Sequence, residues 1–177
     1  IEPKNAKQWR KLVGYTSQSP FLLTGTVLDN IVFGNQKKIE SAQDLDKIRN
    51  VASLAGLTDF IDSKQHRGLD TYVGEGGRLL SGGQRQRLVI ARALFNDQTV
   101  LIFDEATTAL DNRNEATVLN SISSVKNDPI VIIISHDLDA LRYCDRVLCL
   151  EDGQICFDGT FNQSKDFFIK KRKPDKN

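Results

Sequence analysis

The chain has 177 residues, enough for one domain with its own hydrophobic core. Hydrophobic residues make up 40% of the sequence and charged residues 27%, which is typical of folded globular proteins and not of disordered ones. The formal net charge is +1, so the overall charge does not indicate binding to nucleic acid or to a membrane surface. The longest purely apolar run, residues 130–134, is far shorter than the roughly 20 residues that a membrane-spanning helix needs.

The first half of the chain is predicted to contain a short strand followed by helices. The strand spans residues 12–16 and ends at the proline-containing break Ser17–Pro20. Further segments show helical spacing of apolar residues between a capping residue and a stop signal: Thr26 to about Gly34, Ser41 to Gly56, and Ser81 to about Asn96.

The second half alternates apolar runs with helical patterns. Residues 100–103 and 130–134 are wholly apolar, and helical patterns begin near residue 111 and cover about residues 137–142. Strands that are apolar on both faces and alternate with helices are typical of parallel sheets that are covered on both sides. We therefore expect an α/β fold with a parallel sheet and helices on both of its faces.

A β-hairpin is predicted near the end of the chain, because Asp152-Gly153 is a strong signal for a two-residue turn. Such a turn pairs Glu151 with Gln154 and places Cys149 opposite Cys156. The cysteines show no metal-ligand spacing, and we expect them to be reduced thiols in a cytosolic protein.

The segment Leu80-Ser81-Gly82-Gly83-Gln84 stands at a predicted helix start. Its glycines let the backbone approach a ligand closely, and a helix N-terminus offers unpaired N–H groups and the positive end of the helix dipole. Such a site suits a phosphate group. Taken alone, the segment is explained equally well as a serine N-cap followed by a glycine loop.

Polar side chains follow both apolar runs of the second half. Residues 100–103 lead into Asp104 and Glu105, and residues 130–134 lead into Ser135 and His136. In phosphoryl-transfer folds an acidic residue at the end of such a strand holds Mg²⁺, and ligands bind beyond the carboxyl ends of the strands. A neighbouring carboxylate can polarise an attacking water. If the two strands are parallel neighbours, His136 lies at the same edge of the sheet as the two carboxylates.

Together these segments resemble the motifs of ATP-binding cassette (ABC) ATPases, in the order in which that family has them. The matches are Gln18 to the Q-loop glutamine, Leu80–Gln84 to the signature sequence, residues 100–105 to the Walker B strand, Ala109-Leu110-Asp111 to the D-loop, and His136 to the switch histidine. The resemblance covers residues 1 to about 160. It implies a P-loop NTPase-like fold with an inserted helical subdomain, and ATP and Mg²⁺ as cofactors.

The resemblance implies catalytic and metal-binding roles for residues at the strand ends. Asp104 would hold Mg²⁺ through water, and Glu105 would act as general base or orient the attacking water. His136 would contact the γ-phosphate. Gln18 would sense Mg²⁺ and connect the site to a membrane domain.

The resemblance also implies that a second copy takes part. Ser81 and Gly83, with Gly82 and Gln84 beside them, would meet the γ-phosphate of ATP that is held by another nucleotide-binding domain. Asp111 would lie across this contact. Each complete site would then need two cassettes packed head to tail, as a homodimer or a heterodimer.

One motif of the family is missing from the sequence. The phosphate-binding pattern G-x-x-x-x-G-K-[ST], the Walker A motif, does not occur in the 177 residues. In the family it precedes the Q-loop, so we interpret the chain as lacking its amino-terminal part. We expect the complete protein to be an ATPase and this chain alone to be inactive.

Two segments indicate the export-type branch of the family. Residues 70–77 resemble the X-loop, in which Glu75 would respond to the membrane domain, and residues 21–31 resemble the segment after an exporter Q-loop. We therefore expect transmembrane domains as partners, no nucleic acid, and a place at the cytoplasmic face of a membrane. The alternatives are a soluble ABC ATPase of DNA repair or translation and a non-catalytic interaction fragment. Nothing in the sequence identifies a cargo.

The motifs suggest a division of the chain into segments. In chain order these are a Q-loop and coupling segment, a helical subdomain with the X-loop and signature, a core with the Walker B strand, D-loop, histidine and hairpin, and a C-terminal helix with a basic tail: residues 1–34, 35–98, 99–160 and 161–177.

Overall fold

The computed structural model describes residues 6–33, 39, 41–107, 110, 112–122 and 128–172. The chain divides into two compact units, the first ending at Ile134 and the second beginning at Ser135. Within the described residues, no helix combines the length and the apolar character needed to cross a bilayer.

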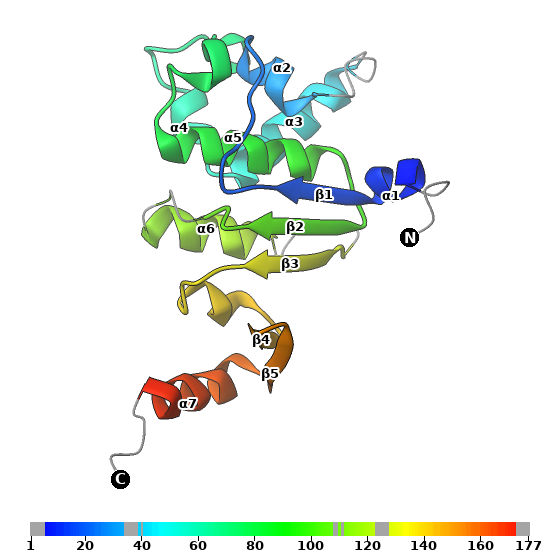
Figure 1. Cartoon of the computed structure of the whole chain (residues 1–177). Coiled ribbons are helices and arrows are strands. Elements are labelled where there is room, and N and C mark those ends of the chain that lie inside the picture. Colours follow the sequence, from blue (N-terminus) through cyan, green and yellow to red (C-terminus); the bar gives the residue numbers. More distant parts are fainter. Residues whose placement is uncertain are drawn as a thin grey trace. The chain divides into compact units, whose positions relative to one another are not determined.

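A three-stranded parallel sheet forms the centre of the first unit, as the sequence predicts (Figure 1). It consists of β1 (Val13–Thr16), β2 (Val100–Asp104) and β3 (Ile130–Ile134), with β2 in the middle. Helix α1 (Ala6–Leu12) runs directly into β1, so the strand predicted over residues 12–16 begins one residue later than expected.

The two faces of this sheet differ in burial. On one face Leu101 and Phe103 are each 1% exposed, and Figure 1 shows α6 (Asn112–Ile122) behind the strands. On the other face Tyr15 is 57% exposed and Ile132 is 44% exposed. We expected helices on both faces of the sheet. Among the described residues, helices cover only the face that carries Leu101 and Phe103.

The helices with predicted caps form where the sequence places them. They are α2 (Val27–Ile31), α3 (Ala42–Leu54) and α5 (Gly82–Phe95), and each has a capping box at its start. Helix α3 stops at Gly56, whose φ of +70° suits a residue without a side chain. Helix α2 ends before the predicted stop, Gly34, which lies outside the described residues.

Short elements connect these helices to one another. They are α4 (Thr58–Ile61) and the 3₁₀ turns η3 (Gly68–Asp70) and η4 (Glu75–Gly77). Thr26 and Tyr72 form an antiparallel β-bridge, which ties the start of α2 to the segment between η3 and η4.

The second unit contains a hairpin and a helix. A 3₁₀ turn, η5 (Ala140–Tyr143), takes the place of the helix predicted over residues 137–142. Strands β4 (Val147–Glu151) and β5 (Gln154–Gly159) form the hairpin, and α7 (Phe161–Arg172) follows it.

The predicted turn of the hairpin is confirmed, but the predicted pairing of its cysteines is wrong. Asp152 and Gly153 both have positive φ, at +50° and +78°, as a two-residue hairpin turn requires. Glu151 pairs with Gln154 as expected, but a bulge then shifts the register, and Cys149 pairs with Phe157 instead of Cys156. A bulge leaves one residue without a partner on the opposite strand.

Candidate functional site

Asp104 is the last residue of β2, at the carboxyl end of the central strand. Its Oδ2 accepts a hydrogen bond of 2.7 Å from the hydroxyl of Tyr15 on β1. This hydrogen bond, with smaller effects of desolvation and of the carboxylate charge, raises the pKa of Tyr15 above its ordinary value. The sequence alone does not indicate this contact.

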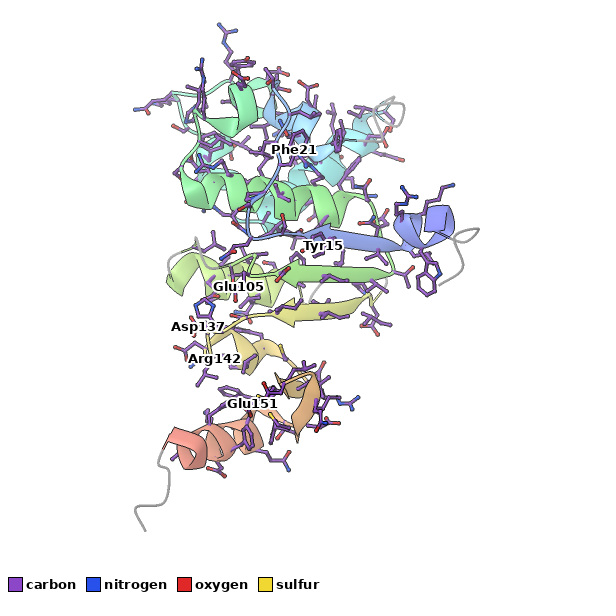
Figure 2. The ribbon with its side chains drawn as sticks, in the orientation of Figure 1. Tyr15, Phe21, Glu105, Asp137, Arg142 and Glu151 are labelled. Carbon is purple, nitrogen blue, oxygen red and sulfur yellow. The ribbon has the colours of Figure 1, made fainter. Side chains whose placement is uncertain are left out.

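Glu105 follows β2 directly and has an unusual backbone conformation. Its φ is +51°, in the left-handed region that side-chain-bearing residues seldom adopt. Its N–H still donates to the carbonyl of Ile134 at 2.9 Å, which continues the ladder between β2 and β3. Such strain is held in place by the surrounding structure and is frequent at functional sites. Figure 2 shows Glu105 beyond the end of β2, with Tyr15 on the neighbouring strand.

The chemistry of these residues fits a Mg²⁺ ion that is bound together with phosphates. Within the described part of the chain, no group of three or more His, Cys, Asp or Glu side chains could hold a metal by itself. Mg²⁺ commonly takes one or two carboxylates and completes its octahedron with water and substrate phosphates. Asp104 supplies a carboxylate of this kind at a strand end.

Ser81 is the N-cap of α5 and holds the start of the helix in a defined geometry. Its Oγ accepts from the N–H of Gln84 at 3.2 Å, and its own N–H donates to Oε1 of Gln84 at 2.9 Å. The first-turn N–H groups of Gly82 and Gly83 have no carbonyl partner inside a helix. Because the Ser81 oxygen accepts in this arrangement, its proton stays available for donation to an anion.

The remaining predicted site residues fall in different parts of the chain. Gln18 is exposed in the turn after β1, whose carboxyl end lies beside that of β2. His136 is exposed in the second unit, and Asp111 lies outside the described residues. Figure 1 shows α5 running opposite to the strands, so its first turn points to the same end of the first unit as the carboxyl ends of the strands.

Arg92 on α5 forms a network that sequence reasoning missed. It donates to the carbonyl oxygens of Asn30 and Phe21 and to Oδ1 of Asn30, each at 2.8 Å. Asn30 is fully buried, and its Nδ2 donates to the carbonyls of Leu23 and Thr26 at 3.1 and 3.0 Å. Burial lowers the pKa of Arg92 to about 10, so the guanidinium is still charged at neutral pH.

The two segments that resemble exporter motifs lie next to each other. The N–H of Val27 donates to the carbonyl of Thr71, and the N–H of Val73 donates to the carbonyl of Gly25, both at 2.9 Å. The pairing joins the segment after Gln18 to the segment that contains Glu75.

Comparison with known proteins decides the family. The sequence profile described as "ABC transporter" matches residues 1–108, more than half of the chain.

The chain belongs to the ABC transporter family.

Export-type ABC proteins are among its relatives. It is 41% identical to the alpha-hemolysin translocation ATP-binding protein HlyB of Proteus vulgaris over 85% of this chain and 20% of that protein. It is 40% identical to the ATP-dependent lipid A-core flippase of Vibrio parahaemolyticus over 88% of this chain and 26% of the flippase. The structure of a bacterial Atm1-family ABC exporter with ATP bound superposes with a TM-score of 0.80 at 31% identity, over 97% of this chain and 30% of that one.

The chain spans between a fifth and a third of the length of these export-type ABC relatives. The fold prediction of an α/β ABC ATPase domain is confirmed by the structural match. The likeness to exporters supports the export-type interpretation over the alternative of a soluble ABC ATPase.

Proposed function

We propose that this chain is the nucleotide-binding domain of an export-type ABC transporter, and that the complete protein hydrolyses ATP to drive transport. The observation that carries the proposal is the pair Asp104 and Glu105 at the carboxyl end of the central strand of a parallel sheet, with Glu105 held in a strained backbone conformation. Ligands of open α/β sheets bind at this end of the strands.

The chain's own residues can then be given roles in hydrolysis. Mg²⁺, when bound, would neutralise charge on the phosphates. Asp104 would hold a water molecule that is bound to Mg²⁺. Gln18, in the turn after β1, would place an amide oxygen near the ion. Glu105 would accept a proton from the attacking water or orient it. His136 is proposed as a contact of the γ-phosphate.

Residues at the start of α5 would complete the site of a second domain. Ser81 can donate its hydroxyl proton, and the N–H groups of Gly82 and Gly83 point out of the helix at its positive end. Gln84 keeps Ser81 oriented through the capping box. With Asp111, these residues would form the face that a second nucleotide-binding domain contacts head to tail.

A surface for a membrane-domain partner is also proposed in the first unit. The bridged segments expose large apolar side chains, with Phe21 66% and Tyr72 54% exposed, and Leu79 nearby in sequence is 63% exposed. Glu75 of η4, which lies between Tyr72 and Leu79 in the sequence, is also exposed. Transmembrane domains of a transporter would dock here, and the chain would then lie at the cytoplasmic face of a membrane.

The experiment compares two serine caps in the complete protein. Ser81→Ala and Ser41→Ala each remove the serine of a capping box, and each should cost about 1 kcal/mol of stability. Only Ser81→Ala should slow ATP turnover at saturating Mg-ATP, because only Ser81 is proposed to touch a phosphate.

Equal turnover in the two variants would contradict the proposed role of α5. A complete protein without ATP turnover would contradict the ATPase proposal. Membrane spans in the same polypeptide or in a co-purified subunit would separate the exporter from a soluble ABC ATPase.

A further inference from the structure

Tyr15 and Asp104 are 89 positions apart in the sequence and meet across neighbouring parallel strands. Tyr15 is opposite Ile102 in the register, so Asp104 lies two positions further along β2 on the same face of the sheet. Two residues of a parallel strand cover about 6.6 Å. A tyrosine side chain is long enough to bridge this diagonal, and its rigid ring fixes where the hydroxyl arrives.

The hydrogen bond uses one of the two carboxylate oxygens. The Tyr15 hydroxyl donates to Oδ2 at 2.7 Å, and Oδ1 accepts no hydrogen bond from the residues that the structure describes. Before any ligand binds, Oδ2 of Asp104 is therefore hydrogen-bonded to Tyr15, whereas Oδ1 is not hydrogen-bonded to a described residue.

We infer that Tyr15 is a positioning residue, whose hydroxyl holds the Asp104 carboxylate so that Oδ1 is presented to a divalent cation or its bound water. This inference rests on the proposed function. Without the hydroxyl, the Asp104 side chain would have to be ordered when the metal binds. Ordering one side chain on binding corresponds to about a 2- to 10-fold loss of affinity.

A purely structural role of the Tyr15 hydroxyl is disfavoured by its surroundings. Tyr15 is 57% exposed, and its hydrogen bond to Asp104 is solvent-accessible. Exposed hydrogen bonds of this kind add little to the stability of a fold. For the residues of this chain, removing the hydroxyl should therefore leave the free energy of unfolding almost unchanged, and its effect should be found in metal binding.

The test uses Mn²⁺ as the metal probe in the complete protein with a non-hydrolysable ATP analogue. Mn²⁺ binding is followed by electron paramagnetic resonance, which needs no turnover. Tyr15→Phe should weaken Mn²⁺ binding by about 2- to 10-fold and leave both the melting temperature and the metal-free affinity for the analogue unchanged. Tyr143→Phe, which removes the hydroxyl of a tyrosine in η5, is the matched control and should not change Mn²⁺ binding.

A double-mutant cycle shows whether Tyr15 acts through Asp104. In an Asp104→Asn background, Tyr15→Phe should have no further effect on Mn²⁺ binding. Unchanged Mn²⁺ binding in Tyr15→Phe, an equal loss in both backgrounds, or a lowered melting temperature would each overturn the inference. A parent protein that binds the analogue without Mn²⁺ dependence would overturn the proposed function and the inference with it.

Discussion

Arg92 of α5 and Asn30 of α2 are joined by two hydrogen bonds of 2.8 Å, from Nε to the Asn30 carbonyl and from Nη2 to its Oδ1. A third bond from Arg92 reaches the carbonyl of Phe21, also at 2.8 Å. Arg92 therefore ties the helix that begins at Ser81 to the segment that follows Gln18. Two motifs that are distant in the sequence are held by one side chain.

Replacing Arg92 with methionine should destabilise the protein by about 2–3 kcal/mol. Methionine keeps much of the side-chain volume, but it leaves the buried oxygens of Asn30 without their charged donor. Urea unfolding measures the loss. Arg49→Met on the exposed face of α3 is the control and should stay within about 0.5 kcal/mol of the parent. Equal stability of the two variants would mean that the network does not hold these segments together.

Cys144 and Cys156 should differ in their rate of alkylation. Burial, with a smaller effect of the neighbouring Asp145, raises the pKa of the Cys144 thiol, whereas Cys156 is exposed. Because the thiolate is the reactive form, Cys144 should react more slowly than Cys156 at pH 7 and should accelerate as the pH rises toward its pKa. Mass spectrometry after brief maleimide treatment gives the order. Asp145→Asn should speed the reaction at Cys144. An unchanged reaction rate would contradict the effect of the Asp145 charge on the pKa of Cys144.

The ion pair between Arg146 and Asp158 should respond to acid. Arg146 donates to both carboxylate oxygens at 2.8 and 2.6 Å, and these hydrogen bonds hold the pKa of Asp158 below its ordinary value. A lowered pKa means that the stabilisation is present above the ordinary aspartate range and is lost as the pH falls through the folded-state pKa. An NMR titration of Asp158 should show a midpoint that rises in Arg146→Gln. Arg142→Gln, which removes the partner of Asp139, should leave it unchanged.

Much of the fold was predictable because its signals are local in the sequence. Ser41 and Ser81 start helices through capping boxes that involve residues three positions later, and Asp152-Gly153 sets its turn through its own backbone. Asp104 and Glu105 were recognisable because an apolar strand leads directly into them.

Other features depend on contacts that a single sequence does not display. The hydrogen bond between Tyr15 and Asp104 requires the register between two strands far apart in the chain. The expected pairing of Cys149 with Cys156 is wrong because a bulge shifts the register of the hairpin between Leu150 and Cys149. The residues of the turn do not indicate this bulge.

The substitution Glu105→Gln in the complete protein tests the central claim most directly. It removes the carboxylate that is proposed to act on water and keeps nearly the same shape. ATP turnover should fall by about 10²- to 10⁴-fold, while binding of Mg-ATP stays within a few-fold of the parent. Glu115→Gln in the first turn of α6 is the matched control and should keep its turnover. Turnover by Glu105→Gln within a few-fold of the parent would contradict the account.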